Sequence, residues 1–379
     1  MNLNPNFDYQ EFLKNSWQKK PRLIKQFISA DKLITPNELA GLACESFVES
    51  RFLEENPPKK VQHGPFAEEF FGKLPSKDWI LLVQSVDYFH NKTRLIKELF
   101  DFIPKWRLDD IMVSYATPGG GVGKHFDHYD VFLIQGEGSR LWQLGNPCGP
   151  ETIIDNSSEL NLVSDFSITE EFALDQGDAL YIPPHIPHNG IALTNSLCFS
   201  VGFRAPSIYE MSPDANENIE RAKNPFKRFK NIHTLNKPNF GCEITEKDLE
   251  CAFSLSGYED FEGFVRLFGT IVTEPRSRRQ FLPDEKVDSL QDLLDIVGDH
   301  KKLSLNPISR MAFCVLGNLD LVFLFVDGRT YPVSINEASL VKQMSRNVCF
   351  ENFIYKHQTS ECADIVLDMF KFGSLQIMN

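Results

Sequence analysis

The sequence predicts an α+β fold in which a strand-rich middle region, a sandwich or barrel, lies between more helical segments. Three observations support this. Short β-rich runs punctuated by glycine or proline fill residues 105–205. Helical apolar spacing with some strand marks the first hundred residues. Near the C-terminus, Asp327-Gly328 separates two apolar runs, which is typical of a tight hairpin.

We therefore divide the 379 residues into four regions. Residues 1–104 are a helical and strand lead-in that packs on the barrel. Residues 105–205 are the core, and 206–265 are a helical linker. Residues 266–379 form a winged-helix-like domain, because helices are followed there by a hairpin.

The first region has clear local signals. Thr35 followed by proline and by Glu38 predicts a capped helix start. Residues 79–84 read as a buried strand, and 95–102 as a helix that ends before a proline. An earlier helix is predicted by three apolar residues at helical spacing: Phe12, Leu13 and Trp17.

The later elements are predicted in the same way. In the core we expect strands at 111–115, 131–135, 140–144, 172–174, 179–182 and 198–203. In the last region we expect a hairpin at 319–326 and 329–333, and a helix at 363–372.

Charge and cysteine usage limit the function classes. With 39 basic and 52 acidic residues the net charge is −13, which disfavours direct nucleic-acid binding and suits a basic partner. No C-x-x-C pair, no signal peptide and no apolar run of membrane-spanning length is apparent. We therefore expect reduced thiols, no membrane association and a cytoplasmic location.

The strand-rich region carries a candidate metal site. In an extended segment His125 and Asp127 point to the same face. A rigid Pro-Pro corner leads to a distal histidine, His188, about 60 residues later. Two histidines and one carboxylate form the facial triad of non-haem iron oxygenases, which leaves coordination positions open. His128 alternates to the other face, whereas His185 follows the prolines and its direction stays open.

An arginine is the expected partner for the distal carboxylate if 2-oxoglutarate is the co-substrate. Arg140 begins the strand after the ligand segment, and Arg204 ends the strand at 198–203. Spacing alone does not choose between them.

Three strings, HFDHYDVFLIQGEGSRLWQLG, GDALYIPPHIPHNG and SVGFRAP, closely resemble the JmjC-type bacterial ribosomal oxygenases. The resemblance extends to FLKNSWQKKPRLIK, TPNELAGLACE, QHGPF and LLVQSVD. It implies a double-stranded β-helix (cupin) barrel that uses Fe(II), 2-oxoglutarate and dioxygen. It places the iron on His125, Asp127 and His188, and the 2-oxoglutarate carboxylate on Arg140. Two positions depart from the family pattern, namely His128 and Asn189.

The resemblance also implies a substrate: the β-carbon of an arginine in large-subunit ribosomal protein sixteen. It further implies a homodimer, which we place in the linker with its aromatic residues Tyr209, Phe226 and Phe229. We expect Ser114 or Ser200 to assist Arg140.

The residues directly after the ligand pair, Tyr129 and Asp130, are candidates to line the arginine slot or to be surface residues. The alternatives are a histidyl hydroxylase of the same family, a cupin metalloenzyme without 2-oxoglutarate, and a binding module without activity. The His-x-His…Glu pattern of other cupins is not present here.

Overall fold

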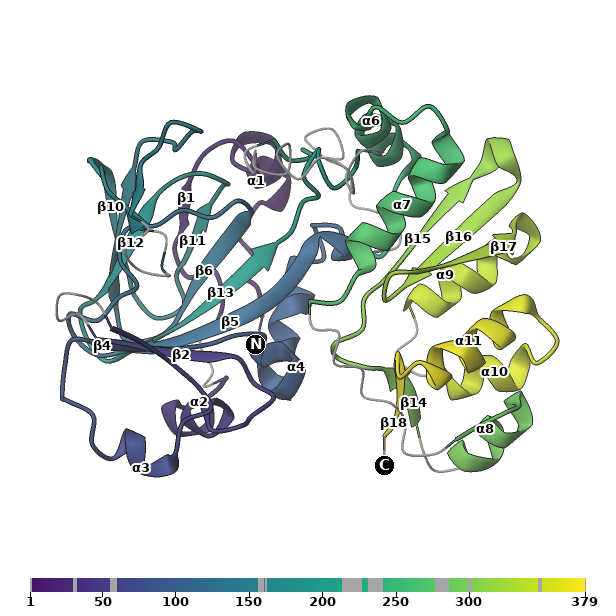
Figure 1. Cartoon of the computed structure of the whole chain (residues 1–379), viewed down its shortest axis with the longest axis horizontal. Helices are drawn as coiled ribbons and strands as arrows, with labels where there is room; N and C mark the ends of the chain where they lie inside the picture. The colour runs from purple at the N-terminus through teal and green to yellow at the C-terminus, as the bar shows by residue number, and fades with distance from the viewer. Residues whose placement is uncertain are drawn as a thin grey trace. The chain divides into compact units, whose positions relative to one another are not determined.

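The computed structural model (Figure 1) describes residues 2–29, 33–54, 60–155, 160, 162–212, 227–230, 241–276, 286–298, 302–346 and 350–378. The chain forms two compact units. The first comprises residues 1–100, 108–204 and 224–226, and the second comprises 101–107, 205–223 and 227–379. No described helix is long and apolar enough to span a bilayer.

The first unit begins with short elements that precede the barrel. They are α1 (Tyr9–Asn15), β1 (Arg22–Ile24), α2 (Pro36–Ala43), β2 (Ser50–Glu54), β3 (Lys60–His63), α3 (Glu68–Phe71), β4 (Trp79–Val83), α4 (Val86–Phe89), α5 (Asn91–Arg94) and the 3-10 helix η1 (Leu95–Phe100).

The capping box at α2 is confirmed, because the Thr35 hydroxyl accepts from the Glu38 amide and the Glu38 carboxylate accepts from the Thr35 amide. The helix expected at 95–102 is instead the short 3-10 helix η1. Strands β1, β2 and β3 were not predicted, since they are short and gain most of their stability from pairing with other strands.

The rest of the first unit is a strand-rich core. Its strands are β5 (Leu108–Ala116), β6 (Asp130–Glu137), β7 (Arg140–Gly145), β8 (Ile154–Asp155), β9 (Leu162–Val163), β10 (Ile168–Leu174), β11 (Ala179–Ile182), β12 (His188–Ala192) and β13 (Ser196–Phe203). All six predicted strands are present. β12 was missed, because Gly190 and the prolines before it lower the strand signal.

Two antiparallel sheets face each other across the core. Among the described residues the larger sheet has the order β1-β11-β6-β13-β5-β4-β2-β3, and the smaller has the order β10-β7-β12. Leu133 and Leu180 of the larger sheet pack against Trp142 and Leu144 of the smaller one. The interior is therefore closed by apolar side chains from both sheets, as expected for the predicted barrel.

The outer face of the larger sheet is covered by the N-terminal residues. Phe132 and Tyr181 alternate with the inward-facing Leu133 and Leu180, so they point away from the interior. The ring of Phe12 in α1 lies 5.3 Å from that of Phe132 and 4.9 Å from that of Tyr181. This packing is what holds the lead-in on the barrel.

The second unit has a three-stranded antiparallel sheet with helices on both faces. Its elements are η2 (Lys105–Arg107), α6 (Glu246–Ser256), α7 (Phe261–Thr273), α8 (Leu290–Val297), β14 (Lys302–Leu305), β15 (Met311–Leu316), η4 (Gly317–Leu319), β16 (Leu321–Val326), β17 (Arg329–Ser334), η5 (Ile335–Glu337), α9 (Ala338–Arg346), α10 (Glu351–Lys356), α11 (Glu361–Lys371) and β18 (Leu375–Met378).

Alternation along β16 builds two cores in this unit. Phe323 and Phe325 pack with α6 and α7, whereas Val322 and Leu324 pack with α8, α9, α10 and α11. Asp327 and Gly328 both have positive φ, as the predicted hairpin turn requires. The expected C-terminal helix is present as α11.

The linker expected at 206–265 differs from the prediction. Its described residues before 246 form turns and two isolated bridges, and helix begins only with α6. Phe229 is fully buried in the core that includes Trp106 and Phe268, so its side chain does not contribute to the dimer surface that we expected there. Tyr209 is half-buried, and Phe226 lies outside the described residues.

Candidate metal centre

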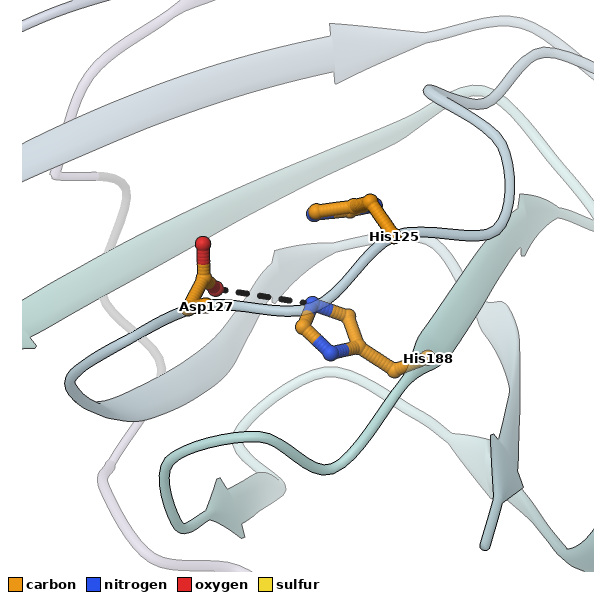
Figure 2. A group of neighbouring side chains, drawn as sticks. All are labelled: His125, Asp127 and His188. Atoms are coloured by element: carbon orange, nitrogen blue, oxygen red, sulfur yellow. Dashed lines mark ion pairs between the residues drawn. The ribbon is translucent and has the colours of Figure 1, made fainter. Parts of the chain in front are cut away.

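Three side chains from two separate segments converge at one end of the barrel interior. His125, Asp127 and His188 each offer one ligand atom, and these atoms lie within 4.8 Å of one another. Figure 2 shows the three side chains turned toward a common point, with His188 Nε2 3.7 Å from Asp127 Oδ2. It is the one such group of histidine, cysteine or acidic residues in the described part of the chain.

Backbone hydrogen bonds hold the two segments together. The His188 amide donates to the His125 carbonyl at 2.7 Å, and the His125 amide donates back to the His188 carbonyl at 3.1 Å. The two histidines are therefore directly opposite each other in a small antiparallel bridge. The His185 amide donates to the Asp127 carbonyl at 2.8 Å, which places Asp127 next to the same pair. Local pairing of this kind holds the segment at 125–127, which lies outside the named strands.

Both ring orientations favour metal binding through Nε2. The Nδ1 of His125 lies 2.9 Å from the Gly123 carbonyl, and the Nδ1 of His188 lies 3.0 Å from the Ile186 carbonyl. A carbonyl only accepts, so each Nδ1 carries the proton and each Nε2 carries the lone pair. Backbone contacts of this kind commonly fix the tautomer of a metal-binding histidine.

Burial keeps His188 neutral. The side chain is 2% exposed. Burial, with a further contribution from His125, lowers the pKa of His188 to about 4. A neutral imidazole is the form that binds a metal ion. The donor set of two neutral nitrogens and one carboxylate suits Fe(II), and it leaves positions for other ligands.

The two other histidines of these strings are separate from this group. The rings of His128 and His185 lie 5.3 Å apart, with Phe126 beside both. His185 has a φ of 68°, in the left-handed region. It lies in the turn that leads the chain into β12. Neither histidine belongs to the three-residue cluster.

A buried arginine lies further along the same wall of the barrel. Arg140 is 3% exposed and donates from Nε to the Ser196 hydroxyl at 2.8 Å and from Nη1 to the Ser114 hydroxyl at 2.9 Å. Its Nη2 donates to the Ser114 and Ser196 carbonyls. Within the described residues it forms no ion pair with a carboxylate. Burial lowers the pKa of Arg140, and a guanidinium still stays charged in proteins.

This arrangement points to an anionic ligand. A buried charge without a partner costs several kcal/mol, so such groups are usually paired. Four of the five N–H donors are used by the two serines, which leaves one N–H on Nη1 among the described contacts. The guanidinium is thus held rigidly with one donor and its charge available.

The remaining predicted residues are placed as follows. Ser114 contacts Arg140, whereas Ser200 lies further along β13, half-buried. Arg204 is half-buried just after β13. Tyr129 is 38% exposed, and its ring lies against Gly202.

Asp130 does not line an open slot. It is fully buried, and its carboxylate accepts from the Tyr181 hydroxyl and from the Gln18 amide. These contacts are on the outer face of the larger sheet, so this position favours a structural role.

Sequence reasoning missed three residues of this region. Ser196 precedes the strand predicted at 198–203, so it was not considered as a partner of Arg140. Trp142 was read only as part of a strand, although it alternates onto the same face as Arg140. Asp109 is half-buried and lies beside Gly202, as Tyr129 does. It was missed because β5 starts at Leu108, three residues before the strand that we predicted.

Comparison with known proteins gives consistent matches. Residues 95–211 match the JmjC domain family. The chain is 43% identical over 206 residues to the ribosomal protein uL16 3-hydroxylase of Escherichia coli (strain K12), covering 54% of each protein. It is 38% identical over 201 residues to a probable ribosomal oxygenase of Haemophilus influenzae, covering 52% of this chain and 50% of that one. In these sequence matches the chain spans about half the length of the curated relatives.

The structural matches run over the whole chain. The X-ray structure of E. coli YcfD matches with a TM-score of 0.77 and 29% identity, covering 100% of both chains. A structure of YcfD, a ribosomal oxygenase from E. coli, in complex with cobalt and 2-oxoglutarate matches with a TM-score of 0.74 and 29% identity, covering 99% of both.

Proposed function

We propose that this chain, a JmjC-domain protein of the ribosomal oxygenase family, is an Fe(II)- and 2-oxoglutarate-dependent oxygenase that hydroxylates the β-carbon of an arginine in large-subunit ribosomal protein sixteen. One observation carries the proposal. His188 of the histidine–aspartate–histidine cluster and Arg140, which has no acidic partner within the described residues, lie on two neighbouring strands of the smaller sheet, β12 and β7.

The cluster would hold Fe(II) through His125 Nε2, His188 Nε2 and an oxygen of Asp127. Three ligands on one side leave room for a chelating co-substrate and for dioxygen. When bound, the iron supplies the activation of dioxygen that C–H hydroxylation needs. The overall reaction consumes 2-oxoglutarate and dioxygen, and it yields succinate, carbon dioxide and the hydroxylated side chain.

The spacing of the wall suits a five-carbon diacid. His188 is paired with Leu144 and Ala192 with Arg140, so four residues separate the two levels. At about 3.3 Å per residue the Cα atoms of His188 and Arg140 are about 13 Å apart. The side chains of both residues extend into this span, so the gap between their polar ends is shorter. A diacid bound to the metal at one end would therefore reach Arg140 with the other. Arg140 would neutralise the distal carboxylate and fix the direction of the molecule.

The substrate arginine would enter at the metal end of the interior. Tyr129, two residues after Asp127, and Asp109 flank Gly202, and Gly202 lies on the face of β13 that also carries Ser200. An aromatic ring and a half-exposed carboxylate are suitable partners for a guanidinium. We assign the acidic role to Asp109 in place of Asp130. The net charge of −13 favours encounter with a basic ribosomal protein.

We further propose a cytoplasmic location and a homodimer. The described cysteines are free, as suits a reducing compartment. With Phe229 buried, the dimer would be built by the surfaces of α6 and α7. Light scattering at micromolar concentration that gives the monomer mass would contradict the dimer.

An assay that measures both products of the reaction tests the function. The protein is incubated with Fe(II), ascorbate, 2-oxoglutarate and a peptide of the target loop, and both succinate and the peptide mass are measured. We expect one oxygen atom gained per succinate, and none on the peptide whose arginine is replaced by alanine. Succinate with a faster-reacting histidine peptide would favour the histidyl hydroxylase. Metal binding without succinate would favour a cupin enzyme that does not use 2-oxoglutarate.

A further inference from the structure

One polar atom inside the barrel is not used by the site described so far. The indole nitrogen Nε1 of Trp142 is buried and has no hydrogen-bond partner among the described residues. The whole side chain is 6% exposed. An unsatisfied buried donor destabilises a protein, so each one needs an explanation.

The position of Trp142 suggests which partner is missing. On β7 the residues Arg140, Trp142 and Leu144 alternate onto the inner face. Trp142 is paired with Gly190, midway between the His188–Leu144 and Ala192–Arg140 pairs. Its ring centroid lies 5.9 Å from that of His188. Trp142 therefore stands on the wall between the candidate metal ligands and the candidate anion anchor.

The neighbouring glycine keeps the indole in this place. A Cβ built on Gly190 would lie 2.6 Å from Cη2 and Cζ3 of Trp142, so the six-membered ring covers the Gly190 backbone. A larger residue at position 190 would push the indole away from the wall. The ring edge that carries Nε1 is opposite to the edge that covers Gly190.

We propose that Trp142 is a further binding residue of the co-substrate and that its Nε1 donates a hydrogen bond to a carboxylate oxygen of the bound 2-oxo acid. This rests on the proposed function. Arg140 has one N–H left for a ligand, so a carboxylate held there needs additional donors. An indole N–H is a donor only, and a carboxylate is an acceptor only, so the two match chemically. The hydrogen bond would also satisfy the buried donor.

Indole resonances give a direct test on the full-length protein. The protein is labelled with 15N, loaded with Zn(II), which is diamagnetic and blocks turnover, and titrated with 2-oxoglutarate. The chain has four tryptophans, and Trp142→Phe identifies one signal. If that variant does not fold, Trp17→Phe, Trp79→Phe and Trp106→Phe identify it by elimination. We expect the Trp142 indole proton to move downfield on saturation and to exchange more slowly with solvent.

Two other tryptophans are internal controls. Trp79 already donates to the Pro75 carbonyl at 2.6 Å, and Trp106 has a buried Nε1 in the aromatic core of the second unit. The indole signals of Trp79 and Trp106 should shift much less than that of Trp142 when 2-oxoglutarate is added. Pyruvate, a 2-oxo acid without the distal carboxylate, locates the acceptor. A shift with pyruvate places it at the metal end, and a shift with 2-oxoglutarate alone places it at the Arg140 end.

Binding constants provide the second readout. Loss of one hydrogen bond to a charged acceptor should raise the Kd of Trp142→Phe for 2-oxoglutarate about tenfold to a hundredfold. If 2-oxoglutarate binds the wild-type protein, but the Trp142 signal stays with the controls and the variant keeps its Kd, the contact is refuted and the proposed function stands. If the wild-type Zn(II) protein does not bind 2-oxoglutarate, the co-substrate assignment itself is overturned, and the contact with it.

Discussion

Arg140 is expected to provide most of the affinity for the distal carboxylate of 2-oxoglutarate. Replacing it by methionine keeps the length of the aliphatic chain and removes the charge and all five donors. One charge-assisted hydrogen bond contributes about 1.5–3 kcal/mol. The free N–H of Nη1 alone therefore predicts a Kd that is about tenfold to more than a hundredfold higher. Calorimetric titration of the Zn(II)-loaded protein measures it without turnover.

The same variant has a predictable effect on stability. It removes the four hydrogen bonds to Ser114 and Ser196, each of which contributes about 0.5–1.5 kcal/mol. It also removes a buried cation whose desolvation costs several kcal/mol. These effects oppose each other, so we expect the free energy of unfolding to change by less than about 3 kcal/mol.

Arg204→Met is the matched control, because it makes the same change at a half-buried position after β13. We expect its Kd for 2-oxoglutarate to stay within about threefold of the wild type, and Arg140→Lys to lie between wild type and Arg140→Met. An unchanged Kd for Arg140→Met together with a large loss for Arg204→Met would refute the reasoning and move the anchor to Arg204.

Three further predictions concern the site and its support. Asp127→Ala should abolish Fe(II) binding and succinate formation. Its melting temperature should stay unchanged, because this side chain is 21% exposed and outside the apolar core. Metal titration and circular dichroism measure the two effects, and full turnover by the variant would disprove the ligand role. Burial lowers the pKa of His188 to about 4, below its usual value of about 6.5, so between pH 4 and 6.5 the unfolded chain binds a proton that the folded protein does not. The metal-free protein should therefore lose about 3 kcal/mol of stability as the pH falls from 6.5 to 4. Urea titrations should show that His188→Gln removes this part of the pH dependence. Gly190→Ala would place a methyl group 2.6 Å from the Trp142 ring and should cost about 1–3 kcal/mol. Gly41→Ala in α2, where nothing lies within 4 Å, is the comparison and should stabilise the protein by about 0.5–1 kcal/mol.

The residues that could be predicted from sequence are those that local patterns place. The His-x-Asp pair and the histidine after Pro183-Pro184 are visible in the sequence, and the structure brings all three together. The strands of the core were found because glycine and proline mark their ends. Arg140 was one of two candidates from spacing. Its burial beside two serines becomes visible only when β7 faces β5 across the barrel.

Other features depend on contacts between distant segments. Asp130 looks like a slot residue beside the ligand pair, but its carboxylate is engaged by Gln18 and Tyr181, which are 112 and 51 residues away. Strand β12 forms because it pairs with β7, despite Gly190. Phe229 lies in a polar, basic stretch that reads as surface, yet it packs on Phe268 in the second unit. Local spacing carries no information about such partners.

We propose that this chain adds one oxygen atom to a ribosomal protein by means of His125, Asp127 and His188. Mass spectrometry of the large-subunit proteins from cells that lack the chain tests it most directly, with complementation by the wild type and by Asp127→Ala. We predict that ribosomal protein sixteen is lighter by one oxygen atom at a single arginine in these cells, that the wild type restores the mass, and that Asp127→Ala does not. Identical masses in all strains, or restoration by Asp127→Ala, would contradict the claim.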